Sequence, residues 1–171
     1  LVYIYIMSNN INLKYHKLNN DWTFYIHLHD NKDWSIDSYI KIARINTIED
    51  AILLNDEINY DLIKKSMMFF MKEDICPLWE HDDNKNGGCF SFKILNKDIN
   101  QVWKEVYYNI VTTNMIKNNN NSKINGITLS PKKKFCILKI WMSDCELTDP
   151  KIFKSIQNLS FDGCLFKKHI A

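Results

Sequence analysis

Glycine is scarce in this chain, with 4 residues in a total of 171. Average usage of about 7% would give roughly 12. A Walker A phosphate loop and a dinucleotide-binding fingerprint each need several closely spaced glycines, and neither pattern occurs. The sequence also lacks HExxH, CxxC and GxSxG motifs, the common signatures of zinc sites and serine hydrolases. Because nothing supplies an evident nucleophile or metal cluster, we predict no enzyme, no catalytic residue, no metal and no cofactor.

The chain also lacks the features of a membrane or disulfide-rich protein. No apolar run approaches the roughly 18 residues of a transmembrane helix. The apolar stretch over residues 1–7 is too short for a signal peptide and has no basic start. The 5 cysteines are odd in number and irregularly spaced, which is typical of free thiols in a reducing compartment. We therefore predict a cytoplasmic or nuclear protein with no membrane partner.

Charge of one sign is not in large excess. The formal net charge is +2, so any contact with a polyanion has to come from a local patch. Arg44 is the only arginine and lysine is abundant, which makes any single lysine cluster less informative than usual. With 46% apolar residues, the chain is long enough to form one globular domain with its own core.

Hydrophobic periodicity predicts more strands than helices. Trp22, Phe24, Ile26 and Leu28 alternate with polar or smaller residues, the pattern of a half-buried strand. The predicted strands cover residues 22–29, 38–45, 67–71, 89–95, 127–129, 135–142 and 161–169. The predicted helices cover residues 47–58 and 98–115, and a last one starts at Asp149-Pro150. One antiparallel sheet with helices on one face is the expected α+β packing, and its open face can hold a site.

Two tryptophans stand apart from the core pattern. Trp22 lies on the core face of a strand and Trp103 on the apolar stripe of a helix, whereas Trp34 and Trp79 lie in polar loops. Glu80 directly follows Trp79. An indole face can stack on a guanine, and a carboxylate can accept hydrogen bonds from its Watson–Crick edge. The Trp-Glu pair is a weak signal alone, because a loop that folds back can also bury its tryptophan.

Three consecutive lysines, Lys132, Lys133 and Lys134, fall in the predicted turn between residues 127–129 and 135–142. Cations on such a turn can hold phosphates as point charges. In a lysine-rich chain, a solvated turn is the other interpretation.

An ordered series of short motifs resembles the eukaryotic translation initiation factor 4E family, which binds the cap of messenger RNA. Each motif is short, and the specificity comes from their number and order over residues 12–171. They are His16-Lys17-Leu18, Asn20-Asp21-Trp22, Lys32-Asp33-Trp34, Thr47-Ile48-Glu49-Asp50, Pro77-Leu78-Trp79-Glu80, Asn84-Lys85-Asn86-Gly87-Gly88, Val102-Trp103-Lys104-Glu105, Ile140-Trp141 at its spacing from Gly126, and Asp144-Cys145-Glu146.

The resemblance implies a fold and a site. The fold would be a single curved antiparallel β-sheet of about eight strands with three helices packed on its convex face. Residues 12–171 would form the cap-binding domain, and residues 1–11 a flexible N-terminal segment. The concave face would bind 7-methylguanosine, with Trp34 and Trp79 on either side of the base, Glu80 on its Watson–Crick edge and Trp141 at the methyl group. Lys132 and Lys134 would hold the phosphates.

Several positions depart from the family pattern. Lys132 stands where the family usually has arginine, so a bidentate phosphate contact becomes monodentate. Ile137 and Cys89 stand where the family has further cations. We therefore expect base recognition to survive with altered phosphate contacts, for which Lys133 can compensate.

The resemblance also implies a partner-binding surface on the convex face, formed by His16, Leu18, Ile48, Ile52, Lys104, Glu105 and Tyr108. Ile52 replaces a family tryptophan, and interfaces of this kind rely on such aromatic residues. We expect weak binding of the usual Tyr-x-x-x-x-Leu-φ peptides and a co-adapted scaffold partner of the initiation factor 4G type. The predicted function is recruitment of capped messages for translation initiation by a monomer. The alternative is a cap-binding repressor or competitor that does not recruit the usual scaffold.

Overall fold

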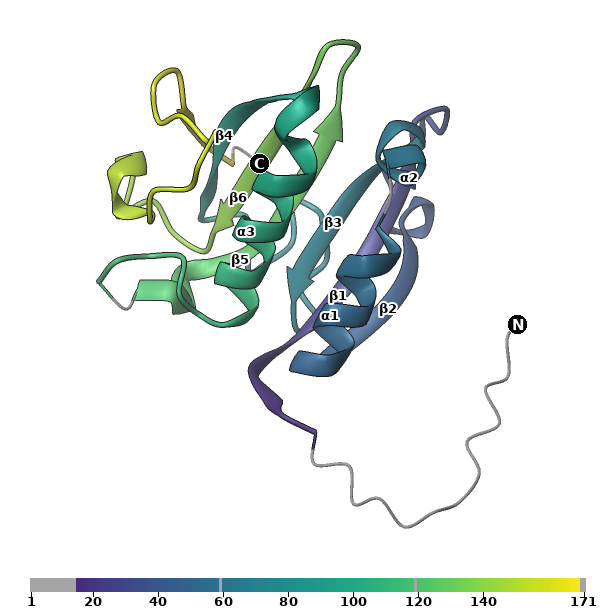
Figure 1. Cartoon of the computed structure of the whole chain (residues 1–171), viewed down its shortest axis with the longest axis horizontal. Helices are drawn as coiled ribbons and strands as arrows, with labels where there is room; N and C mark the ends of the chain where they lie inside the picture. The colour runs from purple at the N-terminus through teal and green to yellow at the C-terminus, as the bar shows by residue number, and fades with distance from the viewer. Residues whose placement is uncertain (1–14, 59, 119, 170–171) are drawn as a thin grey trace.

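The computed structural model describes residues 15–58, 60–118 and 120–169. Within them the chain forms one seven-stranded antiparallel sheet with strand order β2-β1-β3-β5-β6-β4-β7 (Figure 1). The strands are β1 (Lys17–Leu28), β2 (Ile40–Thr47), β3 (Ser66–Lys72), β4 (Gly88–Leu95), β5 (Ile124–Pro131), β6 (Phe135–Met142) and β7 (Leu165–Lys168), and the helices are α1 (Ile48–Glu57), α2 (Tyr60–Lys65) and α3 (Ile99–Val111). The predicted α+β fold is confirmed, with seven strands for the expected eight. The predicted flexible segment over residues 1–11 lies outside the described residues.

The core lies between one face of the sheet and the helices. Trp22 and Phe24 of β1 belong to the same buried cluster as Val102 and Val106 of α3. The residues between them on β1, such as Thr23 and Tyr25, must point to the other face, because side chains alternate along a strand. That second face has no helix among the described residues and carries the site described below.

The helix α1 begins where the sequence predicts. Thr47 is the N-cap, and its hydroxyl accepts a hydrogen bond from the backbone N–H of Asp50 at 3.1 Å. The hydroxyl of Tyr107 donates to the carbonyl of Ala51 at 3.0 Å and joins α3 to α1. Burial raises the pKa of Tyr107 far above its usual range, so this donor keeps its proton.

The last predicted helix is wrong. From Asp149-Pro150 the chain makes only a 3-10 turn, Pro150–Ile152, although Asp149 does accept a hydrogen bond from the N–H of Lys151. The turn ends because Phe153 is extended and fully buried, with its ring 4.9 Å from that of Phe90. Packing of this one aromatic side chain overrides the local start signal.

The third helix is instead α2, which the sequence pattern did not predict. Six residues are too few to show a helical period, and Ile63 is its buried anchor. The closing strand is also shorter than predicted, because residues 161–164 form a turn in which Gly163 has a φ of +77°. Among the described residues, no helix combines the length and apolar character needed to cross a membrane.

Candidate functional site

The open face of the sheet holds a pocket of about 310 Å³ that brings the four predicted base-binding residues together. They arrive from three separate segments: Trp34 from the loop before β2, Trp79 and Glu80 from the loop between β3 and β4, and Trp141 from β6. The remaining lining residues are Tyr39, Met67, Phe69, Pro77, Leu78, Thr128 and Lys139. Three indoles and one carboxylate therefore share one cavity, which we call the base pocket after the sequence prediction.

Trp34 is held in its exposed position by the turn that carries it. The carboxylate of Asp33 accepts hydrogen bonds from both the N–H and the hydroxyl of Ser35, each at 2.8 Å. These bonds lower the pKa of Asp33 and keep it ionised. The turn leaves 53% of Trp34 exposed.

His27 supports Trp34 from within the protein. It points to the open face of β1 and is buried, and its ring lies parallel to the Trp34 ring with centroids 4.1 Å apart. Its Nε2 donates to the backbone carbonyl of Asp33 at 2.7 Å. One side chain thus fixes both the ring and the backbone of this loop.

Asn84 organises the loop that carries Trp79 and Glu80. Its side-chain amide is fully buried and donates to the carbonyls of Cys76 and Leu78, at 2.9 and 2.8 Å. Its Oδ1 accepts from the side chain of Asn125 on β5 at 3.0 Å. These bonds tie both sides of Trp79 to the sheet, while 46% of its own surface stays exposed.

Trp141 forms the floor of the pocket. It is buried on the open face of β6, and its Nε1 donates to the hydroxyl of Thr128 at 2.8 Å. Gly126 pairs with Trp141 across the strands, and a side chain there would lie 2.6 Å from the carbonyl oxygen of Phe70. Glycine at this position therefore lets β5 approach β3 closely.

Two further groups set the electrostatics of the pocket. Burial, with a smaller effect from the nearby Glu80 carboxylate, raises the pKa of Tyr39 to about 12, so its hydroxyl remains a neutral donor. His169 lies with its ring 4.9 Å from that of Trp141, and burial lowers its pKa. Glu80 itself is exposed at the rim.

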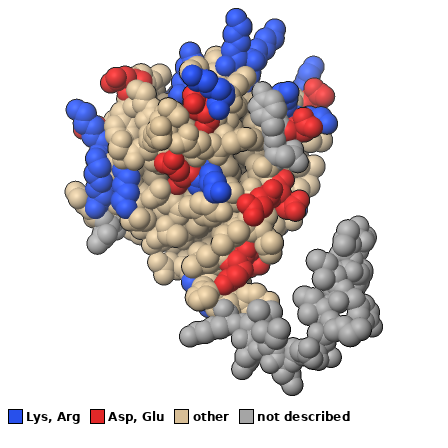
Figure 2. Space-filling model, in the orientation of Figure 1, with Lys and Arg blue, Asp and Glu red and all other residues tan. Residues whose placement is uncertain are grey.

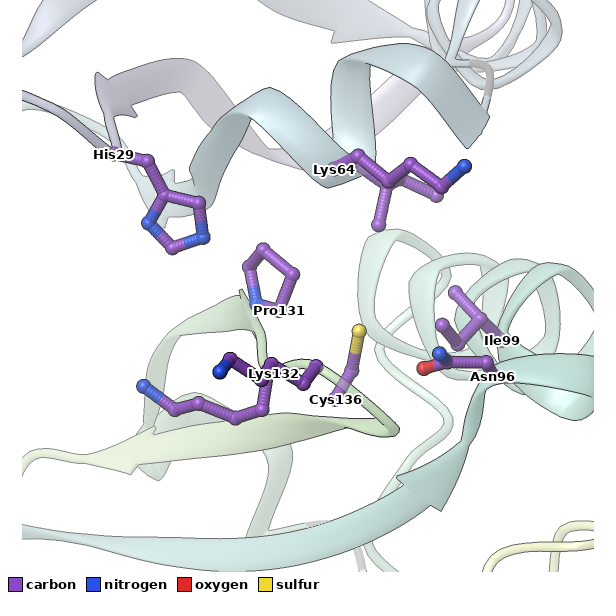
Figure 3. Close-up of a pocket in the computed structure, with 9 residues that line it drawn as sticks. His29, Lys64, Asn96, Ile99, Pro131, Lys132 and Cys136 are labelled. Carbon is purple, nitrogen blue, oxygen red and sulfur yellow. The ribbon is translucent and has the colours of Figure 1, made fainter.

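The predicted phosphate lysines separate in the structure. Lys132 lines a second cavity of about 440 Å³ that shares Trp34, Met67 and Lys139 with the base pocket. Lys132 and Lys133 also line a third cavity of about 560 Å³ beside the turn that joins β5 to β6 (Figure 3). Lys134 is exposed and lines none of these three cavities.

Lys139 is the main residue that sequence reasoning missed. It is the one lysine lining the base pocket and stands two residues before Trp141, so the period-two pattern of residues 135–142 already placed both on one face. Ile137 lies on the same face and lines the second cavity. Cys89 is buried, which raises the pKa of its thiol, although Lys139 and Lys167 act in the opposite direction. Lys139 thus places positive charge near both Ile137 and Cys89, the two positions where this sequence lacks the cations of the family pattern.

The expected partner-binding residues lie on or beside the helices. Ile48 and Ile52 of α1 are 40% and 43% exposed, next to Leu53 at 65%. The remaining ones are His16, whose Nδ1 is 2.7 Å from Glu49; Leu18, which packs against the core; Lys104, whose Nζ is 6.0 Å from the Tyr108 ring centroid; and Glu105, which accepts from Gln101. Acidic side chains gather around this patch on α1 (Figure 2).

Solved structures with a similar fold include two from nematodes. The complex of Ascaris suum eIF4E-3 with m7G cap matches with a TM-score of 0.68 and 21% identity, covering 78% of this chain and 76% of that one. The complex of C. elegans eIF4E-3 with the 4E-binding protein Mextli and cap analog matches with a TM-score of 0.69 and 22% identity, covering 77% and 76%. At these identities the likeness concerns the fold.

Sequence relatives are found among fungi. Eukaryotic translation initiation factor 4E of Saccharomyces cerevisiae is 28% identical over 162 residues, covering 88% of this chain and 74% of the relative. The Eremothecium gossypii protein of the same name is 27% identical, and this chain spans 65% of its length. The family description "Eukaryotic initiation factor 4E" matches residues 17–169, which is nearly everything the structure describes. The chain therefore belongs to the eukaryotic initiation factor 4E family.

Proposed function

We propose that this chain binds the 7-methylguanosine cap of messenger RNA and supports translation initiation in the cytoplasm. The observation that carries the proposal is the single pocket in which two half-exposed indoles, Trp34 and Trp79, stand beside the Glu80 carboxylate. Similar solved structures are complexes with m7G cap and with a cap analog, which supports the same ligand.

The chemistry of the pocket favours a methylated base over plain guanine. Methylation at N7 makes guanine cationic, and a cation over an indole face is stabilised by about 2 kcal/mol or more when desolvated. Glu80 complements the N1–H and exocyclic amine of the Watson–Crick edge. Trp141, fixed by Thr128, forms the floor against which the methyl group packs. No covalent step is involved.

The phosphates would lie along Lys139 and then Lys132. Lys139 lines both the base pocket and the second cavity, and Lys132 lies farther along in the second. Among the described residues, neither lysine is engaged in an ion pair, so both charges are available to a ligand. Cys89 and Ile137 occupy positions where the family pattern has cations. Lys139 and Lys132 supply positive charge from other positions instead.

Binding of 7-methyl-GTP and GTP to the purified protein, followed by tryptophan fluorescence, tests the proposal. We expect 7-methyl-GTP to bind more tightly than GTP. Trp79→Ala should cost about 1–3 kcal/mol, roughly five- to 150-fold in affinity, because a stacking face is lost. Trp79→Phe keeps an aromatic face and is the matched control. Equal affinity of the wild-type protein for the two nucleotides would refute cap binding.

The alternative, a cap-binding repressor that recruits no scaffold, differs on the helix side. The exposed apolar group Ile48, Ile52 and Leu53 on α1 favours a protein partner there, and therefore initiation. The acidic surroundings of this group suit a co-adapted scaffold segment with basic residues beside its apolar ones. Identification of the proteins that co-purify on 7-methyl-GTP resin separates the two functions.

A further inference from the structure

The third cavity, which we call the edge cavity because it lies where the central strands β5 and β6 end at their turn, has the chemistry of a nucleotide site. Figure 3 shows His29 and Lys64 on one side, Pro131, Lys132 and Cys136 from the β5–β6 hairpin on another, and Asn96 and Ile99 on the third. Its volume of about 560 Å³ exceeds the 310 Å³ of the base pocket. Family membership and the proposed function assign it no role.

The lining of this edge cavity is cationic above an apolar floor. Lys64, Lys132 and Lys133 line it, together with His29, and none of its nine lining residues is acidic. Ile63, Ile99, Pro131 and Cys136 are buried and supply the floor. Lysines at the rim suit phosphates, an apolar floor suits a base face, and the Asn96 amide can both donate to and accept from a base edge.

The edge cavity adjoins the second cavity, which in turn adjoins the base pocket. Trp34, Met67 and Lys139 line both the base pocket and the second cavity, while His29 and Lys132 line both the second cavity and the edge cavity. Lys139 pairs with Thr128 and Cys136 with Pro131, so the route advances three residues along β5, about 10 Å. A triphosphate and the nucleotide attached to it span such a distance. Because side chains alternate, Cys136 belongs to the helix-side core, and the route has to pass around the end of the sheet at the β5–β6 turn.

The opposite direction is more acidic. A cavity at the other end of the strands is lined by Glu73, Asp74 and Asp83 together with Lys72, His81 and Asn125, so its carboxylates outnumber its lysine. The edge cavity lies where β5 ends and the lysine turn begins. Figure 2 shows Lys side chains projecting at the top of the molecule, where Figure 1 places this turn.

We propose that the RNA chain that follows the cap leaves the base pocket through the second cavity and binds in the edge cavity between the β5–β6 turn and α2. Lys139 and Lys132 contact the cap phosphates, and Lys133 and Lys64 contact the backbone of the first transcribed nucleotides. This route rests on the proposed cap-binding function and adds its direction and a second binding site.

The test compares 7-methyl-GTP with a capped single-stranded pentanucleotide over a range of salt concentrations. We expect the wild-type protein to bind the capped oligonucleotide more tightly. Lys64→Gln should lower the ratio of oligonucleotide to 7-methyl-GTP affinity about two- to fivefold, the range for an exposed charge pair. It should also reduce the salt slope of oligonucleotide binding by about 0.7, as expected for one lost phosphate contact. Adding Lys133→Gln should reduce the slope further.

Lys65→Gln is the matched control, since Lys65 is the neighbouring exposed lysine on α2 and lines none of the three cavities. Thermal unfolding of both variants checks that α2 stays folded. Equal effects of the two substitutions, or no gain from the oligonucleotide over 7-methyl-GTP, would overturn the route while leaving cap binding intact. Failure of 7-methyl-GTP to bind better than GTP would instead remove the proposed function on which the route rests.

Discussion

The five tryptophans of this protein differ sharply in how much of their surface is exposed to solvent. Trp22, Trp103 and Trp141 are buried, while Trp34 and Trp79 keep about half of their surface in solvent. An exposed indole gives up much of the stabilisation that burial provides. Its position therefore has to be fixed by polar contacts of the backbone around it, which is the role of Asp33 and Asn84. The two exposed rings are prepared for a ligand by residues that do not line the base pocket.

A single hydrogen bond controls the buried Trp141. Thr128→Val removes the acceptor for the Trp141 Nε1 and leaves a buried donor without a partner, which typically costs about 1–3 kcal/mol. We expect a loss of this size in the free energy of unfolding, measured by urea denaturation, together with weaker 7-methyl-GTP binding. Thr128→Ser keeps the hydroxyl and should lose much less. Similar stability of the two variants would contradict the assigned role.

At the scale of elements, the C-terminal segment locks the Trp79 loop to the sheet. Beyond β7, the N–H of His169 donates to the carbonyl of Gly87 at 3.0 Å, and its Nδ1 lies 2.8 Å from the carbonyl oxygen of Asn84. Because a carbonyl only accepts, the neutral imidazole donates from Nδ1. A side chain on Gly87 would overlap the carbonyl oxygen of Met142, so this junction is tightly packed. Hydrogen bonds and close packing thus join the loop, the strand end and the segment after β7.

This junction should weaken in acid. Burial lowers the pKa of His169 below its ordinary value of 6.5, so the unfolded chain takes up the proton more readily than the folded one. The contribution of His169 to stability is therefore full above about pH 6.5 and is lost as the pH falls. When the pH is lowered from neutral to mildly acidic, the free energy of unfolding should fall less in the His169→Gln variant than in the wild type. Urea titrations at each pH measure this difference. An identical pH dependence in both proteins would exclude the histidine as the cause.

At the scale of the whole molecule, the sheet separates two surfaces with different chemistry. The open face carries the base pocket and the second cavity with Lys139 and Lys132, whereas the helix face carries the acidic, partly apolar surface of α1. Core side chains fill the space between the two. Residues on one surface can therefore differ from the family pattern without affecting the other surface. Ile52 on the helix face and Cys89 on the open face are two such differences.

Substitution on one surface should leave the other unaffected. Ile52→Asp places a charge in the exposed group on α1, so we expect the co-purifying partner to be lost from 7-methyl-GTP resin while the protein itself is still retained. Trp79→Ala should have the opposite pattern, with partner binding kept in solution and the resin no longer bound. Joint loss of both activities in Ile52→Asp, with unfolding unchanged, would show that the surfaces are coupled.

The sequence by itself determined the sheet and predicted four of the residues that line the base pocket. Period-two alternation fixes which face of β1 and β6 is buried, and Trp34, Trp79 and Glu80 could be singled out because they interrupt polar loops. The helix N-cap Thr47 could also be predicted from the sequence, because helix-capping signals act over three or four residues. Whether Trp34, Trp79, Glu80 and Trp141 contact a cap stays a prediction that the binding experiments test.

Only the tertiary structure decided the rest. The burial of Phe153 converts a helix start into a 3-10 turn, and Ile63 makes a helix from six residues without a readable period. Lys64 of α2 lines the same cavity as the lysines of the β5–β6 turn only because the fold brings these segments together. The hydrogen bond between Asn84 and Asn125 likewise joins segments far apart in the sequence. Local patterns specify which way a side chain points, whereas a cavity arises from contacts between segments far apart in the sequence.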